Sequence, residues 1–253
     1  MRYHVLGCSG GEAPGFRLSS FLIEGHLLID TGSVVSVLEV AQQAKIDHIL
    51  LTHSHLDHTG GLPLLADNIF GMRATPVQVH GIAPTLDGVR RNLLNDVLWP
   101  DFTRIPSSAF PTLLYREVPE DGPCELGGFT VTAIRVNHTV ECVAFFIQGR
   151  RGTLLHVGDT GPTDAIWRHA QSVPRLLAVC IETTFPNRLQ EVAEASGHLT
   201  PQAVEKELQK LDRDVPVYVY HLKPSYRQEI LAELKRLRRP AVHILENGKL
   251  YRF

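Results

Sequence analysis

The 253-residue sequence lacks several features that would place it in a specialised class of protein. It has no uninterrupted run of about 18 apolar residues, so no transmembrane helix is expected. Its first residues, MRYHVLGCSGG, contain no basic segment followed by an apolar one, so no signal peptide is expected either. A formal net charge of −2 gives no global attraction for nucleic acid or an anionic membrane.

Cysteine is also sparse, and the four cysteines are scattered without any C-x-x-C pair: Cys8, Cys124, Cys142 and Cys180. This spacing argues against a cysteine zinc site and against a disulfide scaffold. A protein of the reducing cytoplasm is therefore the expectation.

Histidine, by contrast, is abundant, and its densest cluster lies in the segment HILLTHSHLDHTGGL at 48–62. The apolar run before the cluster predicts a short buried strand. Side chains two positions apart in an extended chain share a face, so His53, His55 and Asp57 can converge at the strand end, while His58 points elsewhere. Three imidazoles and a carboxylate are ligands that suit a borderline divalent ion, and zinc fits them best. Metal binding explains this cluster better than a polar loop with capping histidines.

Hydrophobic periodicity divides the remaining chain between strands and helices. Strands are predicted over 3–8, 20–24, 27–30, 49–51, 77–80, 113–118, 129–136, 141–148, 153–157, 176–182, 216–220, 241–245 and 249–252. Helices are predicted over 34–43, 82–98, 163–172, 201–211 and 225–238, with one more after His58. Three prolines in 99–112 exclude a long regular element. We interpret that segment as a connector rather than a loop over the active-site mouth.

Three of these helices carry start signals in the sequence. Ser33 is a plausible N-cap for 34–43, Thr200 precedes a first-turn proline, and Ser225 with Gln228 forms a capping-box pattern. Strand-rich halves flanked by helices predict two sheets packed face to face with helices outside. We therefore expect an α/β fold, a four-layer αββα sandwich, formed by a single domain over 1–253.

The pattern His53-x-His55-x-Asp57-His58 resembles the metal signature of the metallo-β-lactamase superfamily of hydrolases. This resemblance implies the same αββα fold and further metal ligands at later strand ends. The implied ligands form a first group, a second group and a bridge: His53, His55 and His138; Asp57, His58 and His221; and Asp159. Two divalent metal ions are implied, with zinc expected and iron or manganese as alternatives. Asp30 is interpreted as a hydrogen-bond partner of a ligand histidine, although it could simply end its strand.

A second segment, 181–204, indicates the branch of the superfamily. Its core, SGHLTP at 196–201, lies at a predicted helix start, which offers free N–H groups to an anionic oxygen. His198 there can hold a phosphate or protonate a leaving alkoxide. Together with HLDH at 55–58, FPN at 185–187 and HLKP at 221–224, this core resembles the class II 3′,5′-cyclic nucleotide phosphodiesterases. The resemblance covers roughly residues 3–226.

Ribonuclease Z offers a second resemblance, through its Gly-His-Ser/Leu-Thr-like segment and through Gly158-Asp159-Thr160. However, no inserted basic arm for a transfer RNA is found, so nucleic acid is not the expected partner. The expected partner is a small phosphodiester, and no membrane is involved. Superfamily members often form homodimers, but no apolar stripe in this sequence identifies an interface.

The resemblance thus implies a dinuclear phosphodiesterase acting on a small cyclic phosphodiester, with 3′,5′-cyclic AMP or GMP expected. A metal-bridging hydroxide oriented by Asp57 and Asp159 would attack phosphorus, assisted by His198. Lys223 either adds positive charge near the phosphate or is an ordinary surface lysine. The alternatives are a ribonuclease Z-like RNA phosphodiesterase and a non-hydrolytic di-iron oxygen-binding sensor. Related redox sites resemble His-x-Glu-x-Asp, so a histidine at position 55 favours hydrolysis.

Overall fold

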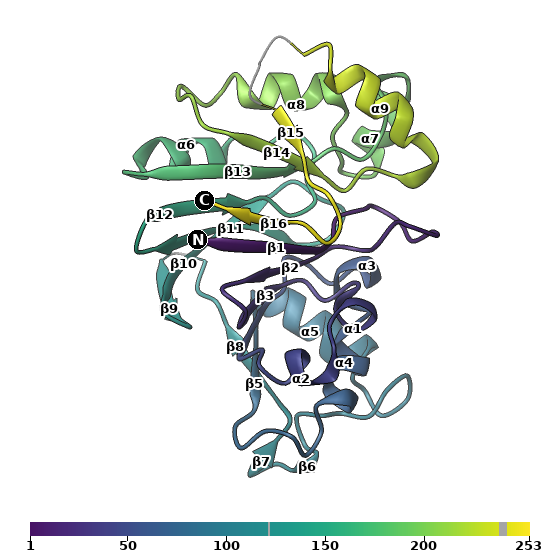
Figure 1. Cartoon of the computed structure of the whole chain (residues 1–253), viewed down its shortest axis with the longest axis vertical. Coiled ribbons are helices and arrows are strands. Elements are labelled where there is room, and N and C mark those ends of the chain that lie inside the picture. Colours follow the sequence, from purple (N-terminus) through teal and green to yellow (C-terminus); the bar gives the residue numbers. More distant parts are fainter. Residues whose placement is uncertain (121, 238–241) are drawn as a thin grey trace.

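The computed structural model describes residues 1–120, 122–237 and 242–253. Two seven-stranded sheets face each other, with helices on the outer side of each (Figure 1). The first sheet has, in spatial order, β16 (Leu250–Arg252), β1 (Arg2–Gly7), β2 (Ser20–Ile23), β3 (Leu27–Ile29), β4 (His48–Leu50), β5 (Val77–Gly81) and β8 (Leu113–Glu117). The second has β15 (Val242–Ile244), β14 (Val217–Tyr220), β13 (Leu176–Glu182), β12 (Gly152–His156), β11 (Cys142–Gly149), β10 (Phe129–Val136) and β9 (Pro123–Leu126).

The helices fall into two groups, one for each sheet. Those on the side of the first sheet are α1 (Val34–Val37), α2 (Val40–Gln43), α3 (Leu56–Thr59), α4 (Leu62–Asn68) and α5 (Ala83–Asn92). Those on the side of the second sheet are α6 (Ala165–Ser172), α7 (Gln190–Ala195), α8 (Pro201–Leu208) and α9 (Arg227–Leu234). Single 3₁₀ turns span Asn187–Leu189 and Pro224–Tyr226, and β6 (Pro106–Ser107) and β7 (Phe110–Pro111) form a small hairpin.

Three apolar clusters fill the spaces between these layers. Phe21 and Phe145 lie in the cluster between the two sheets. Trp167 belongs to the cluster beneath the helices of the second sheet, and Leu65 to the one beneath the helices of the first. Each sheet therefore buries both faces, and the four-layer αββα sandwich predicted from the sequence is confirmed.

Parallel pairing sets where the loops of functional interest emerge. Strands β3, β4, β5 and β8 are parallel neighbours, and so are β12, β13, β14 and β15. Parallel strands buried on both faces read as continuous apolar runs, as in LLI of β3 and VYVY of β14. Their carboxyl ends meet at a shared edge, and the polar loops that follow are brought together there.

The helix predicted over 34–43 is interrupted. Leu38 has an extended backbone (φ −92°, ψ 135°), which ends α1 before α2 begins. Ser33 does not cap the helix with its side chain, because its Oγ accepts a hydrogen bond from the Leu18 backbone N–H at 2.8 Å. The prediction of one continuous amphipathic helix was therefore wrong. Leu38 carries no helix-breaking signal from which this interruption could have been predicted.

Two further helix boundaries differ from the sequence prediction. The helix expected over 82–98 ends at Asn92, and the Asn95 side chain instead accepts hydrogen bonds from the following backbone in a turn. The capping box at Ser225 is absent, because Ser225 lies inside a 3₁₀ turn and α9 begins after Tyr226. The predicted end of that helix, residue 238, and the predicted strand start at 241 lie outside the described residues.

Other local predictions fared better. The Thr200 Oγ1 accepts a hydrogen bond from the Ala203 backbone N–H at 3.3 Å and so caps α8 as predicted. The segment 99–112 contains no long element and forms the β6–β7 hairpin, which lies at the end of the molecule remote from α8 (Figure 1). The four cysteines are free, as their spacing predicts. Across the described ranges, no helix combines the length and apolar character needed to cross a membrane.

Candidate metal centre

The residues predicted as metal ligands gather at the edge where strand ends meet. His53 follows β4, His138 follows β10, Asp159 follows β12 and His221 follows β14. The short helix α3 carries Asp57 and His58, and His55 lies at its N-cap. These ligand residues therefore follow strand ends in the structure, as the sequence indicated.

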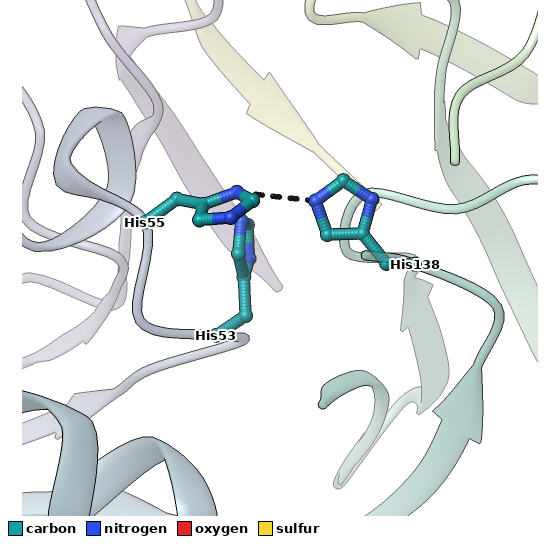
Figure 2. Close-up of side chains that lie close together, drawn as sticks. All are labelled: His53, His55 and His138. Atoms are coloured by element: carbon teal, nitrogen blue, oxygen red, sulfur yellow. Dashed lines mark hydrogen bonds between the residues drawn. The ribbon is translucent and has the colours of Figure 1, made fainter. Parts of the chain in front are cut away.

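The first group consists of His53, His55 and His138, whose candidate ligand nitrogens all lie within 4.8 Å of one another. The His55 Nδ1 and His138 Nε2 atoms are 3.1 Å apart, and the three rings converge from two loops (Figure 2). Burial lowers the pKa of all three imidazoles, which favours their neutral, lone-pair-bearing forms. The His138 Nδ1 is 2.8 Å from the Gly197 carbonyl oxygen, to which it can donate, leaving Nε2 free to accept.

The second group consists of Asp57, His58, Asp159 and His221, again with candidate ligand atoms within 4.8 Å. The Asp159 Oδ2 is 3.4 Å from both His58 Nε2 and His221 Nε2. The same oxygen is 3.8 Å from His53 Nε2 in the first group. Asp159 therefore stands between the two groups.

Two buried atoms in this centre test whether the residues fit a cation. Within the described residues, His53 Nε2 and Asp159 Oδ1 have no hydrogen-bond partner. Leaving such atoms unpaired costs about 1–3 kcal/mol each. A divalent cation would give both atoms a partner, and it would also relieve the close approach of the facing nitrogens of His55 and His138. Imidazole and carboxylate ligands without thiolate suit zinc, iron or manganese.

Asp30 supports the second group from behind. It is fully buried, and its Oδ2 lies 2.7 Å from His58 Nδ1 and accepts from the Thr52 hydroxyl at 2.8 Å. Its Oδ1 accepts from the Thr52 backbone N–H at 2.9 Å. Burial by itself would lower the pKa of His58, but Asp159 and Asp30 raise it well above its usual value. The contact with a ligand histidine that we favoured for Asp30 is present.

His198 lies beside both groups, and a buried carboxylate that the sequence analysis missed holds it. The Glu182 Oε1 accepts from His198 Nδ1 at 2.8 Å and from the backbone N–H groups of Thr160 and Leu199, each at 3.2 Å. Its Oε2 accepts from the Thr184 hydroxyl at 2.7 Å, and that hydroxyl is 3.0 Å from His221 Nδ1. The available signal was a lone carboxylate ending the apolar run LLAVCIE. A carboxylate in that position also ends ordinary strands.

Lys223 is not a free surface lysine. Its Nζ donates to the Gly10 carbonyl oxygen at 2.8 Å and lies 5.8 Å from the centroid of the Phe185 ring. The lysine thus ties the loop after β14 to the loop after β1, close to His221. Neither interpretation from the sequence, a positive charge near the phosphate or an ordinary surface lysine, includes this tethering contact.

Imidazoles and carboxylates that could hold a metal ion, gathered at the strand-end edge of an αββα sandwich, define a metal-dependent hydrolase with the metallo-β-lactamase fold. The chain belongs to the beta-lactamase superfamily, because the family model described as a beta-lactamase superfamily domain matches residues 27–221. That range contains both ligand groups and Asp30.

The chain is also similar to three individual proteins. A probable 3′,5′-cyclic-nucleotide phosphodiesterase from Yersinia pestis is 26% identical over 290 residues, which cover 92% of this chain and 82% of that protein. A ribonuclease Z from Bradyrhizobium sp. is 28% identical over 268 residues, covering 84% and 85%. The crystal structure of unliganded yeast PDE1 superposes with a TM-score of 0.82 at 18% identity, over 98% of each chain. The structural likeness concerns the fold.

Proposed function

We propose that this hydrolase is a phosphodiesterase with two divalent metal ions, zinc being the expected metal. The observation that carries the proposal is the position of the Asp159 carboxylate, 3.8 Å from His53 and 3.4 Å from His58. The residues would be divided between the ions in three sets: His53, His55 and His138 for one; Asp57, His58 and His221 for the other; and Asp159 for both. When bound, two such ions supply Lewis-acid stabilisation of phosphoryl oxygens and lower the pKa of a nucleophilic water.

The chain's own groups supply orientation and a proton. Asp57 has a side chain that is 31% exposed, so its carboxylate can reach a water at the mouth of the site. The Glu182 carboxylate holds His198 by Nδ1, which leaves its Nε2 to hold a phosphate oxygen or to donate a proton to the leaving oxygen. The His198 side chain is 11% exposed, so it is accessible to a substrate while most of the ring is covered.

We propose a 3′,5′-cyclic nucleotide as the substrate. The name of the Yersinia pestis relative supports this choice, and so do the segments around His198 and His221 that resemble the cyclic nucleotide enzymes. An RNA substrate, which the name of the Bradyrhizobium relative raises, would need a positive surface to hold its phosphates. The net charge of −2 and the lack of an inserted basic arm favour the small substrate.

The test is hydrolysis of 3′,5′-cyclic AMP, bis-p-nitrophenyl phosphate and a precursor transfer RNA, each with zinc and with a chelator. Chelator-sensitive cleavage of cyclic AMP and of the generic diester is expected. Cleavage of the precursor RNA without cyclic AMP would replace the substrate, and cleavage of none would overturn the activity. His198→Ala should lose activity, whereas His243→Ala, on β15 outside the metal centre, serves as a matched control.

A further inference from the structure

A cavity of about 550 Å³ lies where the first and second sheets meet near the chain termini. Among the described residues that line it, Glu24 is the one carboxylate and four are arginines: Arg2, Arg150, Arg151 and Arg252. They come from the start of β1, the turn between β11 and β12, and the end of β16. Residues distant in sequence thus place several guanidinium groups around one hollow.

This arginine cavity is at the opposite end of the strands from the metal centre. Strand β1 begins at Arg2 beside the cavity and leads to Gly10, which packs against His221. Strand β10 begins at Phe129 in the cavity wall and leads to His138. An eight-residue strand has seven steps of about 3.3 Å, which separates its ends by about 23 Å. Figure 1 shows the same separation, with the termini at one end of β1 and α3 near the other.

Among the described residues that line the cavity, positive charges outnumber negative ones. Arg2 pairs with Glu24 at 2.8 Å. In the part of the chain that the structure describes, no carboxylate lies within ion-pair distance of Arg150, Arg151 or Arg252. Arg2 and Arg252 are also direct register partners on the antiparallel strands β1 and β16. Like charges in that relation destabilise a sheet, so a bound anion would relieve repulsion.

The rest of the wall is aromatic and open. Phe129 is buried, and the His26 ring stacks on it with centroids 6.0 Å apart and planes inclined by 26°. Gly128 has a positive φ of 81°, and a Cβ added there would meet nothing within 4 Å. The cavity therefore combines a ring-lined wall with a cationic rim, at a volume typical of small-molecule sites.

We propose that the arginine cavity binds a phosphate-bearing organic anion of nucleotide size, at a site distinct from the metal centre. Guanidinium groups bind phosphate through paired, charge-assisted hydrogen bonds, and the ring-lined wall accommodates the less polar part of the ligand. This inference rests on the charges and shape of the cavity and is independent of the proposed catalytic function.

The test uses ¹H–¹⁵N correlation spectra of the full-length, metal-loaded protein titrated with 5′-AMP, inorganic phosphate and adenosine. The amide signals of Gly128 and Gly149 report on the cavity, whereas those of Gly158 and Gly197 report on the metal centre. With 5′-AMP, the cavity signals should shift in a saturable way. Inorganic phosphate should shift the same signals more weakly, and adenosine should leave them unchanged.

The variant Arg151→Gln/Arg252→Gln should weaken 5′-AMP binding at the cavity signals by about tenfold or more, because charge-assisted contacts are lost. The matched control Arg116→Gln/Arg168→Gln makes the same charge change at exposed arginines elsewhere and should bind as the wild type does. Shifts confined to Gly158 and Gly197 would overturn the proposal. Equal affinity in the two double variants would overturn it as well.

Discussion

Replacing Asp30 by asparagine keeps its shape but exchanges one buried oxygen for an NH₂ group. The Asp30 carboxylate accepts from the Thr52 backbone N–H, from the Thr52 hydroxyl and from His58 Nδ1. Because Asp30 accepts a hydrogen bond from Nδ1–H of His58, the Nε2 lone pair of His58 is directed at the metal centre, 3.4 Å from Asp159 Oδ2. The carboxylate thus fixes the tautomer that a metal requires.

In the Asp30→Asn variant, the remaining oxygen keeps the Thr52 backbone N–H, and the new NH₂ group donates to the Thr52 hydroxyl and to His58 Nδ1. The new amide group stays paired, but the His58 proton moves to Nε2. To bind a metal through Nε2, His58 must carry its proton on Nδ1, where that N–H faces the NH₂ group of the variant. These two facing donors cost about 1–3 kcal/mol. That cost corresponds to roughly a 5- to 150-fold loss of metal affinity.

The assay is zinc affinity by competition with a chromophoric chelator, alongside denaturant unfolding of the metal-free protein. Asp30→Asn should weaken binding of one zinc equivalent while changing metal-free stability by less than about 1 kcal/mol. Asp47→Asn is the control, because that exposed carboxylate pairs with Arg73 at the surface, away from the metal centre. Wild-type zinc affinity in Asp30→Asn, or a large loss of metal-free stability, would refute the tautomer argument.

Four further outcomes follow from the contacts of the metal centre and the core. His198→Ala should lower kcat for cyclic AMP by about 10²–10⁴-fold at unchanged zinc content, and loss of zinc would contradict its assigned role. Asp159→Ala should reduce zinc bound per chain, so that full occupancy by elemental analysis would argue against a bridge between the groups. Glu182→Gln should slow cyclic AMP hydrolysis more than that of bis-p-nitrophenyl phosphate, whose nitrophenolate leaves without a proton; equal losses would count against proton donation. Burial lowers the pKa of His156 to about 3 from its usual 6.5, so the unfolded state binds more protons between these values. Stability should therefore fall as pH drops below 6.5, by up to about 1.4 kcal/mol per pH unit, and denaturation curves of His156→Gln should show a shallower dependence.

The candidate centre was readable from the sequence because its ligands follow strand-like runs. A strand end is identified by a local apolar pattern, and parallel strands bring their ends to one edge whatever the loops contain. His53, His138, Asp159 and His221 each lie just after such a run, and the resemblance to the superfamily selected the last three of them. Asp30 also follows a strand, and the contact with a ligand histidine that we favoured for it is made with His58.

Other features depend on contacts that no local pattern encodes. Glu182 ends its strand as many carboxylates do, and only the folded chain brings it to His198. The sequences around Leu38 and Ser225 are compatible with an α-helix, yet the helix is interrupted at Leu38 and a 3₁₀ turn forms at Ser225. Tertiary packing overrides such weak local preferences. The arginine cavity assembles its side chains from both ends and the middle of the sequence, so composition alone shows only a protein of nearly neutral charge.

The most direct test of the two-metal account is anomalous X-ray scattering from crystals of the zinc-loaded protein, combined with elemental analysis in solution. The account predicts two zinc ions per chain. One should lie among His53, His55 and His138, and the other beside His58 and His221, with the Asp159 carboxylate contacting both. A single ion, or a second ion located away from Asp159, would contradict it.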